Sequence, residues 1–310
     1  MNESPYSYNM DRPRRSRRPT SYQGRHVRPQ YAGAILRALG ILLAIALVVY
    51  LLAAPHLFNV ERTKITVSSM ASGTPDIRVV FVSDIHRGSF PFTTADDVKR
   101  LVSSINAQKP DIVILGGDYA ADPDSAAAFF RELPTIRASY GVYAIAGDTD
   151  REEGNFQRLC SAMLSANVNP LLDEKVTLRI GNQNVILVGA DDVATVGSLN
   201  NVSKLASGCK SDDLVIFACH DPQYVDETLA LLTADGHKGF YDLGLFGHTH
   251  GGQMPVLNLL GMYTSATYRE GWYSPNRSSS VLVSRGIGME KLPLRLLTPP
   301  TIHVITLGRN

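Results

Sequence analysis

Short apolar runs rich in Val and Ile alternate with helical stretches from residue 76 onward, and this alternation constrains the fold most strongly. Runs of this length, bounded by Gly, Asp and Pro, are typical of buried strands. The expected strands are 77–84, 111–118, 141–148, 185–191, 214–220, 243–248, 281–286 and 301–307. Helices are expected at 93–109, capped by Thr93 or Thr94, and near 124–137 and 152–166. Strands that alternate with helices predict an α/β domain whose sheets are covered by helices.

Several of the expected strands end on a residue that can bind a metal ion. Four of them end on Asp84, Asp118, Asp148 and His220, and the strand at 243–248 delivers His248 and then His250. In open α/β sheets the ligand crevice lies at the carboxyl ends of the strands. Side chains that are far apart in the sequence can therefore meet at one point.

The sharpest single motif is GHTHGGQ at 247–253. In an extended segment the side chains of residues i and i+2 lie on one face, so His248 and His250 can both reach one site. Glycines on both sides of the pair allow the backbone to approach ions closely.

The other motifs allow a purely structural interpretation when each is taken alone. Asp84 could end its strand, His86 could lie in a surface turn, and the Gly-Gly-Asp sequence at 116–118 could be only a turn. Five such elements in this order, each at a strand end, argue against that interpretation for the set. The remaining histidines lack such partners and are expected to be solvent-facing or hydrogen-bonded: His26, His56, His237 and His303.

The order of these motifs resembles the calcineurin-like metallophosphoesterase superfamily. The matching elements are DIH (84–86), GGD (116–118), GDTD (147–150), His220 after a strand, and GHTH (247–250). The run GGQMP (251–255) and the later VSRGIGMEKLPLR (283–295) resemble the membrane-associated or exported bacterial phosphodiesterase branch. The resemblance covers residues 76–310 and implies a four-layer α-β-β-α sandwich, in which two mixed sheets are flanked by helices.

The resemblance also implies two divalent metal ions. The first would be held by Asp84, His86, Asp118 and His250, and Asp118 would bridge to a second held by Asp148, His220 and His248. Asp118, Asp148 and His220 are expected to be catalytic as well. Carboxylates and imidazoles suit Mn, Fe, Zn or similar ions. Two such ions can hold a hydroxide that attacks phosphorus in line, while they neutralise the developing charge.

The third motif departs from the family's usual Gly-Asn-His followed by Asp or Glu, because Asp148 and Thr149 replace the Asn and the His. Asp148 keeps an oxygen ligand and adds a negative charge, which should tighten metal binding and weaken attraction of an anionic substrate. The missing His would donate to the phosphoryl oxygen or leaving group, a contribution of about 10²–10⁴-fold in rate. The chain is therefore an active enzyme that prefers good leaving groups, or alternatively a metal- and phosphate-binding envelope protein with little turnover. The other four motifs keep the family's pattern, and this favours an active enzyme.

The composition favours a globular core over disorder. Hydrophobic residues make up 44% of the chain and charged residues 19%. Three cysteines are too few for a disulfide framework, and Cys219 is expected to be buried in an apolar run. Residues 1–37 contain eight Arg against Glu3 and Asp11, so the remaining 273 residues carry a net charge of about −5. A mildly acidic body is a poor partner for nucleic acid.

The basic N-terminal region leads into a long apolar run. Residues 1–31 are rich in Pro, Ser, Tyr and Arg and are expected to be disordered. Residues 34–55 carry Arg37 as their only charge, and about 20 apolar residues suffice to cross a bilayer. The run exceeds the ~7–15-residue hydrophobic region of a signal peptide, which favours a retained anchor over a cleaved signal. Because arginines crowd its N-terminal side, the tail is expected in the cytoplasm and the body outside it.

The expected organisation is a cytoplasmic tail (1–31), a transmembrane anchor (32–55), a linker (56–75) and a metallophosphoesterase domain (76–310). The expected activity is hydrolysis of phosphate esters, above all phosphodiesters. A site beside a bilayer suits lipid-linked phosphates or pyrophosphates, and a body outside the cytoplasm suits phospholipid or wall-polymer phosphodiesters. A metallo-amidohydrolase is a competing enzyme class, but the sequence lacks the H-x-H-x-D-H run typical of those enzymes.

Overall fold

The structure, a computed structural model, describes residues 31–88, 93–152, 154–252, 267–289, 295 and 298–309. The basic tail at 1–30, which includes His26, lies outside the described residues. The same holds for residues 253–255 of the GGQMP run and for 290–294 of the VSRGIGMEKLPLR run.

Helix α1 (Ala32–Ala53) covers the apolar run without a break. Its span from Gly33 to Leu51 has 19 residues and a mean hydropathy of 2.5, with none of the window buried. A helix of this length and composition can cross a membrane, and a signal sequence near the N-terminus has the same properties.

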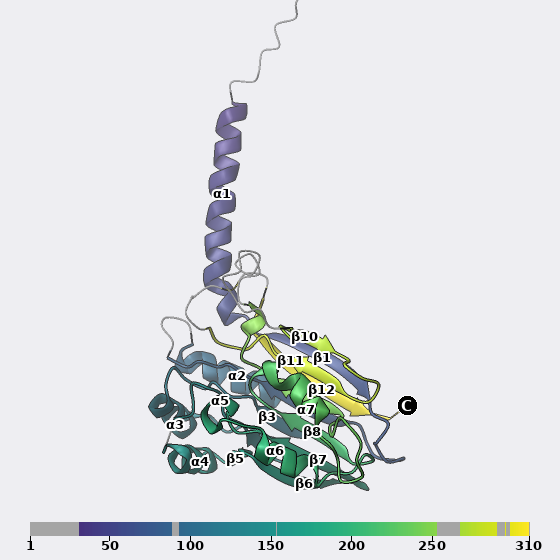
Figure 1. The fold of residues 1–310 in the computed structure, drawn as a ribbon. Helices are drawn as coiled ribbons and strands as arrows, with labels where there is room; N and C mark the ends of the chain where they lie inside the picture. Colours follow the sequence, from purple (N-terminus) through teal and green to yellow (C-terminus); the bar gives the residue numbers. More distant parts are fainter. Residues whose placement is uncertain are drawn as a thin grey trace, which may run out of the picture. The chain divides into compact units, whose positions relative to one another are not determined.

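The following residues form two mixed β-sheets that pack face to face (Figure 1). In strand order, the first sheet contains β1 (Asn59–Thr66), β12 (Thr301–Gly308), β2 (Ile77–Val82), β3 (Ile112–Leu115), β4 (Val142–Ala144) and β5 (Asn169–Pro170). The second contains β10 (Gly271–Tyr273), β11 (Ser280–Val283), β9 (Leu243–Phe246), β8 (Leu214–Ala218), β7 (Gln183–Gly189) and β6 (Glu174–Ile180). Strands β2 to β5 run parallel, as do β7, β8, β9 and β11.

Helices cover the outer face of each sheet. The first sheet carries α2 (Ala95–Ala107), α3 (Pro123–Glu132) and α4 (Phe156–Ser165). The second carries α5 (Val193–Val196), α6 (Asn200–Ala206) and α7 (Val225–Ala230). Short 3-10 turns lie at Ala54–His56, Pro222–Tyr224 and His250–Gly252. The expected four-layer α-β-β-α sandwich is confirmed.

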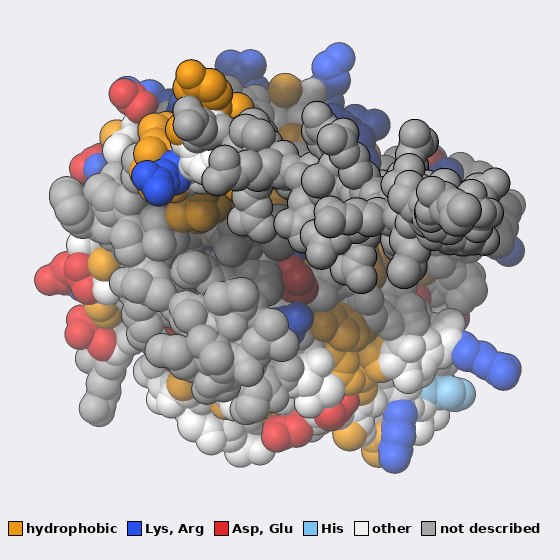
Figure 2. Space-filling model, turned by 90° about the horizontal axis from the view of Figure 1, so that it is seen from above, with side chains coloured by type: hydrophobic (Ala, Val, Ile, Leu, Met, Phe, Trp, Pro, Cys, Tyr) orange, Lys and Arg blue, Asp and Glu red, His pale blue; other side chains and the backbone are white. Residues whose placement is uncertain are grey.

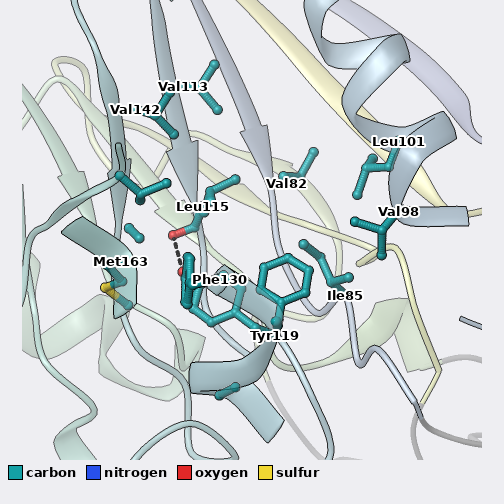
Figure 3. Packing of buried hydrophobic residues seen from close by; sticks show 14 of the residues in the cluster. Val82, Ile85, Val98, Leu101, Val113, Leu115, Tyr119, Phe130, Val142 and Met163 are labelled. Atoms are coloured by element: carbon teal, nitrogen blue, oxygen red, sulfur yellow. Dashed lines mark hydrogen bonds between the residues drawn. The ribbon is translucent and has the colours of Figure 1, made fainter. Parts of the chain in front are cut away.

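Three buried clusters fill the three interfaces between these layers. In the first, Val98 and Leu101 of α2 lie over Val82 of β2 (Figure 3). Tyr119 joins this cluster: its ring packs edge-on against Phe130, and its hydroxyl donates to the Leu115 carbonyl at 3.0 Å (Figure 3). The second cluster lies between the sheets and the third beneath α5, α6 and α7. Because the central strands are buried on both faces, they are apolar throughout rather than alternating.

The strands that lead to the expected site are shorter than the sequence suggests. β2 ends at Val82 and β3 at Leu115, before Asp84 and Asp118 rather than at them. These aspartates have φ values of 53° and 56°, a left-handed conformation that cannot continue a strand. The polar residues therefore lie in the turns that follow the strands.

The helices begin and end for local reasons. Thr94 is the N-cap of α2 and forms a reciprocal capping box with Asp97, which confirms one of the two expected caps. α3 ends at Glu132 instead of 137, because Leu133 precedes Pro134 and takes an extended conformation. α4 begins at Phe156 instead of 152, and the described residues before it, Glu152, Gly154 and Asn155, are not helical.

Residues 56–75, expected to be a linker, contain β1, which pairs with β12 along its whole length. This part of the segment therefore belongs to the first sheet. β1 and β6 were not expected because their sequences, NVERTKIT and EKVTLRI, are rich in charged residues. As edge strands with one face toward solvent, they need little apolar surface.

Candidate metal centre

Loops from both sheets meet at one edge of the sandwich. They follow β2, β3 and β4 of the first sheet and β8 and β9 of the second. The structure brings the seven expected side chains together in two clusters, each with donor atoms within 4.8 Å of one another. The clusters are Asp84, His86 and His250, and Asp118, Asp148, His220 and His248.

Asp118 lies between the two clusters. Its Oδ2 atom is 3.4 Å from Nε2 of His86 in the first cluster and 3.2 Å from Nε2 of His220 in the second. One carboxylate oxygen that faces imidazoles of both clusters is placed to be shared between two cations.

The two clusters differ in their exposure to solvent. Asp84, His86 and His250 are buried, and Nε2 of His250 lies 3.6 Å from Oδ1 of Asp84. In the second cluster, the side chains of Asp148 and His248 are 47% and 34% exposed, and Nδ1 of His248 lies 3.2 Å from Oδ1 of Asp148. A ligand from solution therefore reaches the centre beside Asp148 and His248.

The backbone around the centre adopts an uncommon conformation. Positive φ values occur at five of the seven residues: Asp84, His86, Asp118, His248 and His250. Only a few per cent of non-glycine residues adopt such values, and they gather at functional sites. Position 147 requires glycine because the backbone there lies against the side chain of Asp118: a Cβ atom would be 2.2 Å from Oδ1 of Asp118. The loops are thus shaped around the carboxylates at some conformational cost.

The hydrogen bonds of His220 indicate that a cation belongs at the centre. Its Nδ1 lies 2.7 Å from the carbonyl oxygen of Gly116, which can only accept a proton. In the neutral ring, Nε2 therefore carries a lone pair, and it is buried without a hydrogen-bond partner among the described residues. That lone pair faces carboxylate oxygens of Asp118 at 3.2 Å and Asp148 at 3.5 Å. With a neutral ring three electron-rich atoms converge, so this position requires a positive charge, which either a proton on Nε2 or a metal ion between the three atoms supplies.

The profile of the calcineurin-like phosphoesterase family matches residues 77–252, which include all seven of these side chains. The chain belongs to this family. It is 29% identical over 260 residues to the uncharacterized metallophosphoesterase YkuE of Bacillus subtilis, which covers 82% of this chain and 86% of YkuE. It is 28% identical over 279 residues to a transmembrane protein with metallophosphoesterase domain of Bos taurus, which covers 85% of this chain and 60% of that protein. The match to an uncharacterized metallophosphoesterase of Helicobacter pylori (26% identical) likewise covers 75% of this chain and 60% of the relative.

In this metallophosphoesterase, carboxylates and imidazoles shift one another's pKa values. Burial disfavours the charged form of Asp118, but the charge of His220, its hydrogen bond and the charge of His86 together outweigh burial and hold the pKa of Asp118 below its usual range. Burial also disfavours protonated His220, yet Asp118 and Asp148 raise its pKa well above 6.5. The hydrogen bond with Asp148 raises the pKa of His248. Without metal ions, the second cluster therefore retains protons near neutral pH.

These pKa shifts predict a steep pH dependence of metal binding. A metal ion must displace the protons on His220 and His248, whose pKa values are both raised, so its affinity falls as the pH falls. Between pH 7.5 and 6.5, two imidazoles of ordinary pKa would weaken binding about threefold, whereas two with raised pKa values weaken it by up to about 100-fold. Calorimetric titration of the metal-free protein at both pH values measures the ratio. A decrease of threefold or less would contradict the prediction.

Thr149 stands where the family usually has His, and it contacts the central carboxylate. Its backbone N–H and its hydroxyl donate to Oδ1 of Asp118 at 3.1 and 2.9 Å. Both hydrogen bonds from Thr149 end on Oδ1, so they leave Oδ2, the oxygen that faces both clusters, available to a metal ion. Thr149 orients the carboxylate, a role that its place in the motif did not reveal.

Asp150, at the end of the third motif, is a positioning residue without an expected role in the sequence analysis. Its buried carboxylate accepts the backbone N–H groups of Asp118 at 2.7 Å, Tyr119 at 2.9 Å and Gly147 at 2.9 Å. Burial and the charge of Asp118 raise the pKa of Asp150 to about 8, although the N–H donors favour the charged form. The carboxylate ties together the loops that carry Asp118 and Asp148. The family's third motif usually ends in Asp or Glu, and this feature of the sequence could have indicated the role of Asp150.

The substitution Asp150→Asn is expected to destabilise the protein and weaken metal binding. The amide oxygen can replace one carboxylate oxygen, but the NH₂ group would face at least one of the three N–H donors, and an unsatisfied buried donor costs about 1–3 kcal/mol. We expect a melting temperature lower by about 5–10 °C and a metal affinity lower by about 10–100-fold. Asp212→Asn is the control, because that side chain is exposed. Unchanged melting and metal affinity in Asp150→Asn would show that the three hydrogen bonds do not support the centre.

Arg295 is a second residue that sequence analysis missed. It is fully buried, and its guanidinium donates to the carbonyl oxygens of Gly288, Arg285 and Thr298. Burial lowers its pKa to about 10. These bonds hold the loop after β11, in which Gly286 packs against Asp84.

Of the three remaining histidines that the structure describes, two follow the expectation. His56 is hydrogen-bonded to Asp97 at 3.0 Å, and His237 is 66% exposed. His303 instead lies buried in β12, with neither ring nitrogen hydrogen-bonded among the described residues, so the expectation is wrong there. Burial lowers its pKa to about 3, which keeps the ring neutral. The cysteines are free, and Cys219 is buried as expected.

Proposed function

We propose that this chain is a membrane-anchored phosphodiesterase that depends on two divalent metal ions, of Mn, Fe, Zn or a similar element. The observation that carries the proposal is the position of Asp118, whose Oδ2 faces His86 of one cluster and His220 of the other. When bound, two such ions activate water at neutral pH and neutralise charge that develops on the phosphate.

Each side chain has a proposed role toward these ions. Asp118 would bridge the two ions through Oδ2, while its other oxygen, Oδ1, accepts the hydrogen bond of Thr149. The first ion is assigned to Asp84, His86 and His250, and the second to Asp148, His220 and His248. The Gly116 carbonyl selects the His220 tautomer whose Nε2 faces the centre.

The exposed side of the second cluster is the proposed substrate entrance. Asp148 and His248 line this side, and the negative charge of Asp148 lies where the family usually has a neutral Asn. We propose that Asp148 is catalytic together with Asp118 and His220, by holding the second ion at the open side. This extra charge favours substrates with a single negative charge, and therefore diesters over monoesters.

The test is metal analysis of the purified protein together with a panel of phosphomonoesters and phosphodiesters. We expect close to two metal ions per chain and metal-dependent hydrolysis of bis-p-nitrophenyl phosphate that is faster than that of p-nitrophenyl phosphate. Metal-free protein that is equally active would overturn the proposal. Two bound ions without hydrolysis would support the alternative, a metal- and phosphate-binding envelope protein in which Thr149 replaces a needed proton donor.

We further propose that α1 is retained as an anchor and that the body lies outside the cytoplasm. The apolar helix, the arginines before it and the transmembrane designation of the Bos taurus relative support this placement. Protease added to intact cells is expected to digest the body. A body that is digested only after lysis would contradict the orientation.

Nucleic acid is not expected among the substrates. Among the described side chains on the face shown in Figure 2, acidic and basic groups both occur beside hydrophobic ones. Binding of a long polyanion depends on a concentrated basic surface. Smaller phosphate esters, including lipid-linked phosphates and pyrophosphates, suit this mixed surface better.

A further inference from the structure

The first strand of the body begins at the same edge as the metal centre. β1 runs parallel to β12, and β12 runs antiparallel to β2. β1 is therefore antiparallel to β2 in direction, so its first residue, Asn59, lies at the edge where β2 ends. The side chains of the candidate metal centre follow the strand ends at that edge.

Hydrogen bonds connect this starting point to a candidate metal ligand. The Asn59 amide donates to the Pro300 carbonyl at 2.7 Å, and the next residue, Thr301, donates to the Gly286 carbonyl at 3.3 Å. A Cβ atom on Gly286 would lie 2.7 Å from Cβ of Asp84. Asn59 and Asp84 are thus separated by two hydrogen bonds and one van der Waals contact.

The chain between α1 and β1 is short. α1 ends at Ala53 and β1 begins at Asn59, and Ala54–His56 form one 3-10 turn. Three residues at about 2 Å each and two extended residues at about 3.5 Å each span about 13 Å. The headgroup layer of a bilayer is itself about 5–8 Å thick on each side. We call the edge of the sandwich that carries the candidate metal centre the metal-bearing edge. If α1 crosses a membrane, this edge has to remain close to the lipid headgroups.

A cleft lies between this connecting segment, residues 54–58, and helix α2. It has a volume of about 470 Å³, and its lining includes His56, Leu57, Lys99, Arg100 and Ser103. Two cationic groups and a hydroxyl match the phosphate and glycerol oxygens of a lipid headgroup. Leu57, a residue that is 65% exposed, adds apolar surface of the kind that acyl chains cover.

Both cations of the cleft have an acidic partner on α2, but their side chains remain exposed, so a phosphate group can still reach them. Lys99 pairs with Asp96 at 2.9 Å, but both side chains are well exposed, and such pairs contribute little to stability. Asp97 is buried and binds His56, Arg100 and Thr94 together. Asp97 therefore holds the connecting segment against α2 and keeps the guanidinium at the cleft.

We propose that this cleft binds the headgroup of an anionic phospholipid, that it seats the metal-bearing edge on the bilayer, and that the substrates are phosphate esters of membrane lipids. The inference rests on the proposed function, because it requires both the anchor and the phosphoesterase activity. Together, the short connection and the cleft present the exposed side of the second cluster to lipid phosphates instead of to dissolved ones.

The test uses the full chain in vesicles and two substrates with the same leaving group. Hexadecyl p-nitrophenyl phosphate partitions into the bilayer, and ethyl p-nitrophenyl phosphate stays in solution. The vesicles contain phosphatidylcholine alone or with about a third phosphatidylglycerol. We expect at least tenfold faster hydrolysis of the hexadecyl ester than of the ethyl ester, and a further increase of about threefold or more with phosphatidylglycerol.

Two kinds of variant separate the contributions. Lys99→Gln with Arg100→Gln should abolish the increase caused by phosphatidylglycerol, whereas Lys204→Gln with Lys210→Gln, which removes two exposed charges elsewhere, should keep it. Insertion of 20 Gly and Ser residues between Ala53 and Ala54 allows the body to leave the surface, because such a linker spans about 25 Å on average. The insertion should lower hydrolysis of the hexadecyl ester at least tenfold without changing that of the ethyl ester.

The outcomes distinguish this inference from the proposed function. Equal rates for the two esters, an insertion without effect, or a cleft variant that still responds to phosphatidylglycerol would overturn the inference. Failure of the metal-loaded wild-type protein to hydrolyse either ester would instead overturn the proposed phosphoesterase activity.

Discussion

Substitution of Asp118 by Ala is expected to remove both metal ions and to abolish hydrolysis. Oδ2 of Asp118 faces His86 and His220, so its loss affects both clusters. Removing a single group that stabilises transition-state charge costs about 10²–10³-fold. Loss of the group shared by two ions should therefore cost at least about 1,000-fold. Metal content per chain and the rate with bis-p-nitrophenyl phosphate measure the two effects.

The control for Asp118→Ala is Asp212→Ala, which removes an exposed carboxylate two residues before β8 begins. That end of the strand lies opposite the metal-bearing edge, so metal content and activity should not change. Asp118→Ala protein that keeps two ions and more than about a tenth of its activity would show that Asp118 is not shared between them.

Substitution of Thr149 by His is expected to speed hydrolysis of diesters with poor leaving groups. A His at this position can donate a proton to the leaving oxygen, an effect of about 10²–10⁴-fold where the leaving group needs it. Thr149 adjoins the exposed side of the second cluster, next to Asp148, so a longer side chain has access to the substrate entrance. Rates for ethyl phenyl phosphate and ethyl p-nitrophenyl phosphate measure the effect, and the gain should be confined to the phenyl ester.

The structure also sets a limit on that gain. The Thr149 hydroxyl donates to Oδ1 of Asp118, and a His would lose this bond while keeping the backbone N–H bond. Thr149→Val isolates the loss, because Val has a similar shape without the hydroxyl. We expect weaker metal binding in Thr149→Val and no gain with either ester. A slower reaction of the phenyl ester in Thr149→His at saturating metal would show that Thr149 is not a catalytic deficit.

The boundaries of secondary structure show what local sequence could not predict. Only Ser83 separates the first apolar run from Asp84, and only Gly116 and Gly117 separate the second from Asp118, so the strands appeared to include both aspartates. The turns that end β2 and β3 are imposed by the left-handed conformation of those aspartates. That conformation is supported by contacts with residues distant in the sequence, such as Asp150 for the Asp118 loop.

The edge strands show a second limit of local prediction. β1 has the alternating charged pattern of a surface segment, and it becomes a strand by pairing with β12 at the far end of the chain. No local signal encodes that partner, since strand pairing is a contact between distant segments. The same pairing puts the start of β1 at the metal-bearing edge.

The sequence by itself determined the fold class, the apolar helix and the seven candidate ligands, because periodicity and side-chain chemistry are local properties of a chain. Only the tertiary structure decided that Asp118 lies between the clusters, that Thr149 and Asp150 hold it, and that the connection from α1 arrives beside Asp84. These features depend on which atoms of distant loops come within hydrogen-bonding distance. Such distances follow from how two sheets pack together, and no single segment of the sequence contains them.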